Sequence, residues 1–356
     1  MGCSILLKAV HGGDVYSRDI KYDFSANINP LGMPENAKKA LIDNLTELEK
    51  YPDINCRKLK NSLSEFEKTA AEYIVCGNGA ADLIYKIVQV LTPKKALVIS
   101  PTFSEYERAL NSYSCAAENY SLDENKEFLL CSDILNKINN YDIVFICNPN
   151  NPVGNIFDKE LMTAIVRKCN EKNTYIVVDE CFMGFADKNE QYSLTNMCSR
   201  FPKLIVLKAF TKIFAVPGLR LGYMISGNLE LCEKVESCGQ CWSVSAAAQI
   251  VGAALSKENE YLEKTIEYVK KERAFLTESI RSFDIKVYPS VTNFLLVKSV
   301  MPLDKQLLKY SIAVRSCGDF KGLGEEFFRI AVRTHCENII LINSIKSILN
   351  NSSFIV

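Results

Sequence analysis

The stretch KLIVLKAFTKIFAVPGLRLGYMIS, residues 203–226, decides the fold. It holds two apolar runs, KLIVLK (203–208) and LRLGYMIS (219–226), each short enough for a buried strand and bounded by turn or helix signals. Three similar runs precede it: KALVIS (95–100), DIVFIC (142–147) and TYIVVDE (174–180). Because helical patterns alternate with these runs, we predict an α/β core, with a mostly parallel central sheet flanked by helices.

The C-terminal part of the chain has a different pattern. Residues 258–282, rich in Glu and Lys with apolar residues spaced by three and four, predict one long helix. Weaker strand patterns and a final helix follow at 285–288, 293–297, 312–315, 327–332 and 337–349. We therefore predict a large domain over residues 45–240 and a smaller α+β domain formed by residues 1–44 and 241–356.

Composition and charge narrow the class of protein. Lys plus Arg equal Asp plus Glu, 42 each, so we expect neither nucleic acid nor a membrane surface as partner. The N-terminal apolar run is too short for a signal or spanning segment, so we expect a cytoplasmic protein. Fourteen scattered cysteines indicate reduced thiols. With only two histidines, the CxxC at Cys238 and Cys241 predicts no metal site.

Polar residues follow the predicted strands where open α/β sheets bind ligands. Asn151 follows DIVFIC in CNPNNPVG (147–154), and Asp179 ends the next run. A buried carboxylate is costly without a positive partner, and a protonated heterocyclic nitrogen would be one; the alternative is a cap for the next turn. Lys212 lies between the last two runs, and a lysine in a cleft can form an imine with a carbonyl cofactor. As an isolated residue it would be a surface charge.

Two further features indicate a phosphate site. CGNGAAD (76–82) places Gly-Asn-Gly directly before a helical run, whose first amides could hold a phosphate. Alone this signal is weak, because a Gly turn before a helix is more often just a turn. The planar guanidinium of Arg220 can donate two hydrogen bonds to a phosphate dianion. No GxGxxG follows any strand, which argues against a dinucleotide.

Taken together, GNGAAD, PTF, NPNNPVG, VVDE and FTKIFAVPGLRLGY, in this order and spacing, resemble the fold-type I pyridoxal-phosphate-dependent aminotransferase superfamily. The resemblance covers essentially the whole chain and implies pyridoxal 5′-phosphate as cofactor, held as an internal aldimine. Lys212 would be its attachment point and Asp179 the partner of its pyridinium nitrogen, both catalytic. The other cofactor contacts it implies are Asn151 to O3′, Phe103 stacked on the ring, and Gly79, Ala80, Ala81, Thr211 and Arg220 around the phosphate. It also implies a homodimer in which Tyr51 reaches the neighbouring active site.

Two positions depart from this family pattern. Phe182 stands in DECF where many relatives carry a tyrosine that donates to O3′, so Asn151 would carry that contact alone. Ala209 stands three residues before Lys212, where Ser or Thr is usual, and this removes one phosphate contact. Neither departure removes the core chemistry.

Two motifs near the N-terminus narrow the resemblance to one group within the superfamily. AVHGGDVY (9–16) and YDFSANINPLGMP (22–34) resemble the threonine-phosphate decarboxylases of cobalamin biosynthesis, sisters of the histidinol-phosphate aminotransferases. The implied substrate contacts are His11, Gly12, Asn27, Asn151, Arg315 and Arg329. Arg329 would hold a carboxylate, whereas His11, Asn27 and Arg315 would line the end that takes a phosphate. Without the resemblance, a histidine near an N-terminus is typical of protein surface.

The resemblance implies decarboxylation of O-phospho-L-threonine, a small phosphorylated amino acid, to (R)-1-amino-2-propanol O-2-phosphate through external aldimine and quinonoid intermediates. Two alternatives stay open: transamination of histidinol phosphate with 2-oxoglutarate, and decarboxylation of O-phosphoserine. The last differs by one methyl group, worth only about 1–3 kcal/mol in a pocket. A non-catalytic cofactor-binding regulator is disfavoured, because the sequence has no appended helix-turn-helix and no basic patch.

Overall fold

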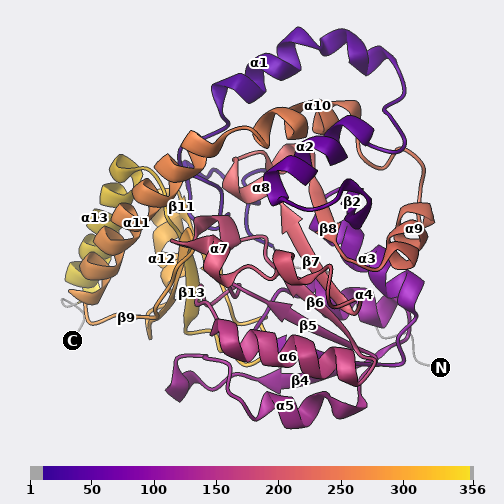
Figure 1. The fold of residues 1–356 in the computed structure, drawn as a ribbon. Coiled ribbons are helices and arrows are strands. Elements are labelled where there is room, and N and C mark those ends of the chain that lie inside the picture. The colour runs from indigo at the N-terminus through magenta and orange to yellow at the C-terminus, as the bar shows by residue number, and fades with distance from the viewer. Residues whose placement is uncertain (1–10, 353–356) are drawn as a thin grey trace.

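The computed structural model describes residues 11–352 and is built around a sheet of seven strands (Figure 1). From edge to edge the strands are β2 (Ile74–Gly77), β8 (Gly222–Ile225), β7 (Leu204–Ala209), β6 (Tyr175–Asp179), β5 (Ile143–Cys147), β3 (Lys95–Ser100) and β4 (Ala116–Ser121). Only β8 runs antiparallel to its neighbours. The five predicted runs are confirmed as strands, and β2 and β4 are additions to them.

Both faces of this sheet are buried, because alternate residues of each strand enter different apolar clusters. In β6 and β7, Val178 and Val206 belong to one cluster, whereas Val177 and Ile205 belong to the other. Helices cover the two faces. They are α2 (Arg57–Glu67), α3 (Ala80–Leu91), α4 (Glu105–Ser112), α5 (Ile134–Lys137), α6 (Lys159–Glu171), α7 (Asn189–Tyr192), α8 (Phe210–Ile213) and α9 (Leu229–Ser237).

A smaller antiparallel sheet in the order β12-β13-β10-β9 lies beside the first and packs against two long helices (Figure 1). Its strands are β9 (Lys286–Val287), β10 (Phe294–Lys298), β12 (Arg315–Ser316) and β13 (Phe327–Ala331). The long helices are α11 (Asn259–Arg281) and α13 (His335–Ser352), and the short α12 (Leu303–Leu307) comes between them in the chain. The N-terminal strand β1 (Tyr22–Asp23) pairs with β11 (Ile312–Ala313), so the two ends of the chain meet here. The predicted fold class is confirmed; the domain boundaries at 45 and 240 stay predictions.

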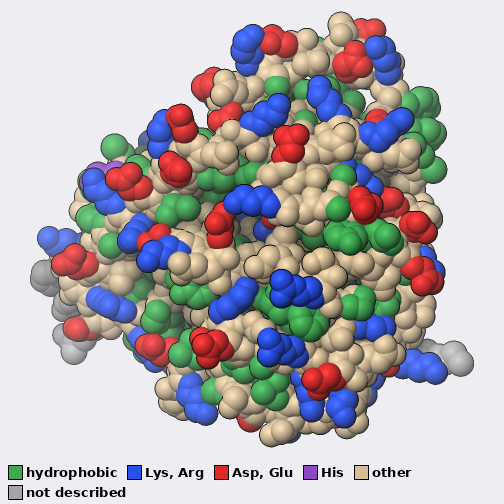
Figure 2. Space-filling view, in the orientation of Figure 1, with side chains coloured by type: hydrophobic (Ala, Val, Ile, Leu, Met, Phe, Trp, Pro, Cys, Tyr) green, Lys and Arg blue, Asp and Glu red, His purple; other side chains and the backbone are tan. Residues whose placement is uncertain are grey.

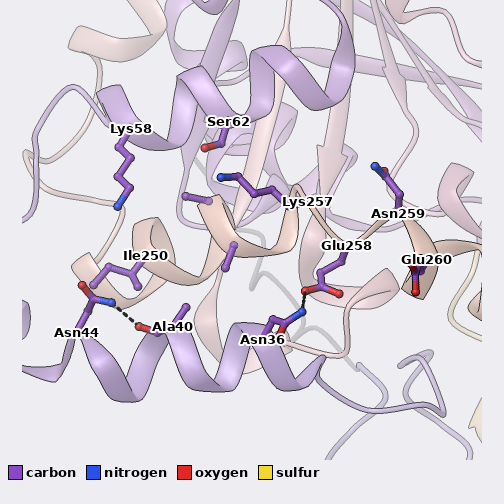
Figure 3. A pocket seen from close by; sticks show the side chains of 12 residues that line it. Asn36, Ala40, Asn44, Lys58, Ser62, Ile250, Lys257, Glu258, Asn259 and Glu260 are labelled. Carbon is purple, nitrogen blue, oxygen red and sulfur yellow. Dashed lines mark hydrogen bonds between the residues drawn. The ribbon is translucent and has the colours of Figure 1, made fainter.

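A third region, α1 (Glu35–Asp43), lies at the rim of the molecule over α10 (Ala246–Leu255). A cavity of about 810 Å³ opens between α1, α2 and α10, and Asn36 of α1 donates to Glu258 across it at 2.9 Å (Figure 3). The residues that line this cavity include none of the predicted site residues. The space is therefore not the predicted cofactor site.

Charged side chains of both signs are interspersed over the face of the molecule in Figure 2, so neither sign dominates that face. Within residues 11–352, none of the helices has the length and apolarity needed to cross a membrane.

Candidate active site

Asp179 is the last residue of β6, and two donors fix its carboxylate. The hydroxyl of Tyr106, in α4, donates to Oδ2 at 2.6 Å, and the amide of Cys181 donates to Oδ1 at 2.9 Å. Tyr106 is fully buried and stacks on Phe145 with ring centroids 5.2 Å apart. Burial and the neighbouring Asp179 charge raise the pKa of Tyr106 well above its usual range, so the tyrosine stays a donor. The carboxylate is thus held in one orientation at the carboxyl end of the sheet.

Lys212 lies in the short helix α8, directly after β7. Burial, and after it the charges of Arg329 and Arg220, lower the pKa of its amine to about 8. A lysine in this condition has a substantial neutral fraction near pH 8 and is therefore a competent nucleophile. The turn is fixed by Asn29, whose amide donates to the Lys212 carbonyl at 3.1 Å and whose side chain donates to the Ile213 carbonyl at 2.6 Å.

The start of α3 and Arg220 form a cradle. Gly79 precedes the helix with φ +84°, and a Cβ there would lie 2.6 Å from Nη2 of Arg220, so only glycine fits. Ala80 and Ala81 are the first two residues of α3, where backbone amides lack helical partners. The guanidinium of Arg220 and these backbone amides lie close together, an arrangement that suits a phosphate. Thr211 is buried nearby in α8, and Ala209 ends β7 without a side chain that could cap that helix.

Arg329, in the middle of β13, is buried, and its hydrogen bonds go to neutral oxygens. Nη1 donates to Oδ1 of Asn151, and Nη2 donates to the Ser25 carbonyl at 2.9 Å. Its Nε has no partner among the described residues. Burial lowers its pKa to about 10. Because Arg329 takes the carbonyl oxygen of Asn151, the amide nitrogen of Asn151 is the atom left to donate toward a cofactor oxygen.

Two aromatic side chains pack on the side of the guanidinium of Arg329. The guanidinium lies over the ring of Phe294, 5.5 Å from its centroid. Phe182 in turn meets Phe294 edge to face, with centroids 5.0 Å apart. Phe182 therefore packs against the ring that lies beneath the arginine, and this contact accounts for an apolar side chain at position 182.

Arg315 is the direct cross-strand partner of Arg329 in the β12–β13 pair. It donates to Oδ2 of Asp319 at 2.7 Å and to the Ser316 carbonyl. Asn27 is also buried, and its side-chain oxygen has no partner within the described part of the chain. A buried acceptor without a partner is consistent with a place for a polar ligand.

His11 and Gly12 lie at the beginning of the described chain. The His11 ring is 5.9 Å from that of Phe103, which meets Tyr106 edge to face. Nε2 of His11 lies 3.2 Å from Oε1 of Glu105. Gly12 lies against Ser25, whose carbonyl is the partner of Arg329. The structure thus joins Gly12 through Ser25 to Arg329, and His11 through Phe103 and Tyr106 to Asp179.

Tyr51 is not brought into this site within one chain. It is 80% exposed and stacks on Trp242 with centroids 4.5 Å apart. Sequence reasoning, conversely, missed Tyr106, Glu105 and Ser25. No signal in the sequence pointed to them, because their partners Asp179, His11 and Arg329 lie far away along the chain.

Metal ligation is not supported by the described side chains: between residues 11 and 352, no group of three or more His, Cys, Asp and Glu is placed to hold an ion. The residues of the site suit an organic cofactor that carries a phosphate. A buried fixed carboxylate, an amine of lowered pKa and an arginine–helix cradle lie around one end of the sheet.

The pattern of the family "Aminotransferase class I and II" matches residues 19–345. The chain belongs to this family. Its members use pyridoxal 5′-phosphate. The residues present fit that cofactor: Lys212 can hold its aldehyde carbon, Asp179 its ring nitrogen and the Arg220–α3 cradle its phosphate. These individual contacts remain predictions from the resemblance and the geometry.

Similar proteins divide between two reactions. The chain is 32% identical to the threonine-phosphate decarboxylase of Salmonella typhimurium, over 97% of this chain and 98% of that one. It is 35% identical to the histidinol-phosphate aminotransferase of Methanosarcina mazei, over 88% and 84%. The crystal structure of histidinol-phosphate aminotransferase from Clostridium acetobutylicum superposes with a TM-score of 0.88 at 31% identity, over 93% of this chain and 99% of that one. Identity alone therefore does not select the reaction of this family member.

Proposed function

We propose that this enzyme decarboxylates O-phospho-L-threonine to (R)-1-amino-2-propanol O-2-phosphate, a step of cobalamin biosynthesis. The observation that carries the proposal is Arg329, a buried guanidinium that hydrogen-bonds only neutral oxygens in the described chain and stands directly opposite a second arginine. Like charges opposite one another destabilise a sheet, and a buried charge needs a counter-charge. A substrate with two anionic groups supplies that compensation.

The distribution of cations supports a carboxylate and a phosphate as these groups. Arg329 lies next to Asn151 and Lys212, on the side where the cofactor is expected. Arg315 and the imidazole of His11 are the groups we assign to the phosphate. The full-length similarity to the Salmonella typhimurium protein and the HGG motif at His11–Gly13 support the same assignment.

Each residue then has a chemical task. When bound, the cofactor supplies an electron sink for the pair left at the substrate Cα. Lys212, whose pKa is lowered to about 8, holds the proton that is delivered to Cα after CO₂ leaves. Asp179, oriented by Tyr106, offers its carboxylate to a cationic ring nitrogen. Arg329 and the phosphate contacts would orient the substrate on the cofactor and so select which Cα bond breaks.

The second candidate is histidinol-phosphate aminotransferase, favoured by the 31% identical Clostridium acetobutylicum structure. Its substrates also present anionic groups to Arg329, in turn a phosphate and the carboxylates of glutamate. O-phosphoserine decarboxylation is a variant of the first candidate that lacks only a methyl group.

A substrate panel tests the proposal. The holoenzyme is incubated with O-phosphothreonine, O-phosphoserine or histidinol phosphate, with and without 2-oxoglutarate, while CO₂ and glutamate are measured. We expect CO₂ from O-phosphothreonine without consumption of the keto acid. Glutamate formation from 2-oxoglutarate with histidinol phosphate, without CO₂, would establish the aminotransferase instead.

We infer that the working unit is a homodimer, with Tyr51 reaching the partner's cofactor phosphate. The argument is a run of exposed apolar side chains along residues 42–54. These are Ile42, Leu45, Leu48, Tyr51 and Ile54, and Trp242 lies beside them. Such a run favours burial against a second copy.

Subunit complementation tests whether Tyr51 acts in the active site of the partner subunit. Mixed dimers of Lys212→Ala and Tyr51→Ala subunits would contain one intact site if Tyr51 acts across the interface, so activity should return on mixing and refolding. Light scattering gives the mass independently. A monomeric mass, or no recovery on mixing, would contradict the assignment.

A further inference from the structure

The described chain begins with a segment, His11–Gly13, that spans the two sides of the candidate site. At one end the amide of Gly13 donates to the Ser25 hydroxyl at 2.8 Å. Gly12 packs so closely on Ser25 that a Cβ would lie 2.1 Å from its carbonyl oxygen. That same oxygen accepts from Arg329 at 2.9 Å. One end of the segment is therefore a single residue away from the arginine expected to bind substrate.

The other end of the segment is fixed by Glu105, the first residue of α4. Its Oε1 lies 3.2 Å from Nε2 of His11, although 94 positions separate the two residues in sequence. The same contact brings the imidazole to within 5.9 Å of the Phe103 ring. His11 is thus held at the edge of the ring-stacking residue, with 47% of its side chain exposed.

Glu105 is itself rigidly placed. It is only 8% exposed, and two further donors reach it from two helices: the Tyr85 hydroxyl to Oε2 at 3.1 Å and Arg108 Nη1 to Oε1 at 2.9 Å. The contact with His11 and then the charge of Arg108 hold the pKa of the Glu105 carboxyl below its usual range. A first-turn Glu that served only the helix dipole would not need a partner from the far N-terminal segment.

We propose that Glu105 is a positioning residue that holds His11 over the substrate-phosphate end of the site and thereby sets the preference for phosphorylated amines. The proposal rests on the proposed function, because it assumes a phosphorylated substrate. With Glu105 on Nε2, the nitrogen of His11 that can face a ligand is Nδ1. A phosphate there would give each imidazole nitrogen an anionic partner.

The test uses the cofactor-loaded enzyme and a matched pair of variants in one helix. Glu105→Gln keeps the shape of the side chain but removes its charge. Glu107→Gln is the control, because Glu107 contacts Asn119 and Lys321 on the other side of α4. The readouts are KM and kcat for the substrate that the panel identifies, and the Kd of O-phosphothreonine, unphosphorylated threonine and inorganic phosphate from changes in the cofactor absorbance.

We expect Glu105→Gln to raise the KM and Kd for the phosphorylated ligand about 5- to 20-fold, as loss of a charge-assisted hydrogen bond predicts. Threonine binding and kcat should change by less than about twofold. In a double-mutant cycle with His11→Ala, the second change should add nothing, because Glu105 acts through His11.

Four outcomes separate the possibilities. Equal loss for phosphorylated and unphosphorylated ligands, or an undiminished Glu105→Gln effect in the His11→Ala background, would overturn the role of Glu105 alone. Normal binding of phosphorylated ligands by Glu105→Gln would do the same. If the wild-type enzyme binds none of the phosphorylated amines, the proposed function fails first and the inference fails with it.

Discussion

The two ends of the candidate site are built in different ways. The cofactor end comes from the seven-stranded sheet: Asp179 ends β6, and Lys212 and Arg220 lie in the connection between β7 and β8. The substrate end joins residues from the two ends of the chain, and the bond between Arg329 and the Ser25 carbonyl spans 304 positions.

This difference separates cofactor chemistry from reaction choice. A sheet's topology fixes where its strands end, so the cofactor end can be the same in family members that catalyse different reactions. The substrate end depends on how the terminal segments pack against β12 and β13. We therefore expect changes at the first end to abolish cofactor binding and changes at the second to alter substrate binding.

The largest expected effect is at the cofactor end. Lys212→Ala should lose both the visible absorbance of the bound cofactor and turnover, by at least about 10³-fold, because no other group supplies the covalent attachment. Lys234→Ala is the control, since Lys234 pairs with Glu230 on the surface of α9. Absorbance spectra after reconstitution and dialysis measure the outcome. Turnover retained by Lys212→Ala would remove the distinction between the two ends.

Arg329→Ala should affect the other end. We expect KM for the substrate to rise about 10- to 100-fold, since a charged hydrogen-bonded contact is worth about 1.5–3 kcal/mol. The Kd of the cofactor, measured by fluorescence titration, should change by less than about threefold. Equal losses of substrate and cofactor binding would show that the two ends are not separable.

The same variant tests the electrostatic link between the ends. In the cofactor-free protein, the Lys212 amine becomes neutral as pH rises through its pKa of about 8, so the rate of cofactor capture should rise with pH and level off above that value. Arg329 is one cause of the lowered pKa. Arg329→Ala should therefore move the midpoint of the pH–rate profile upward, as measured by stopped-flow absorbance. An unchanged midpoint would mean that the charge of Arg329 does not lower the pKa of the lysine.

Tyr106→Phe should give a smaller effect confined to the cofactor end. Removing the hydroxyl leaves one oxygen of the buried Asp179 without a donor, and we expect the cofactor Kd to rise about 3- to 10-fold. Tyr223→Phe is the control, because Tyr223 is equally buried and also donates to a carboxylate, that of Glu67. Both variants should lose stability in urea, but only Tyr106→Phe should weaken the cofactor. Equal cofactor affinities would assign Tyr106 a purely structural role.

The division between the cofactor end and the substrate end also explains which features could be predicted from the sequence. The strands β3, β5, β6, β7 and β8 were predicted because each is a continuous apolar run buried on both faces. β4 was missed because an edge strand with the sequence AAENYS carries few apolar residues. Tyr106 and Glu105 were missed because their partners lie 73 and 94 positions away, and only packing of α4 brings them together.

The smallest expected effect lies where the two sheets meet. Glu124, which follows β4, accepts from Tyr288 at 2.6 Å and from Lys298 of the smaller sheet at 2.9 Å. The hydrogen bond from Tyr288, then that from Lys298, lowers the pKa of Glu124 to about 2. The contact therefore stabilises the fold above the ordinary carboxyl pKa of 4.5, and that contribution is lost as pH falls toward 2.

Because the Glu124 side chain is 32% exposed, solvent screening keeps this contribution below about 1 kcal/mol. Glu124→Gln should lower the free energy of unfolding by that amount at pH 7 and by progressively less from pH 4.5 downward, as measured by urea denaturation. Cofactor and substrate affinities should be unchanged, since Glu124 contacts neither end of the site. A shift in KM without a change in stability would mean that the docking of the two sheets itself adjusts the substrate end, and the separation between the two ends would then be incomplete.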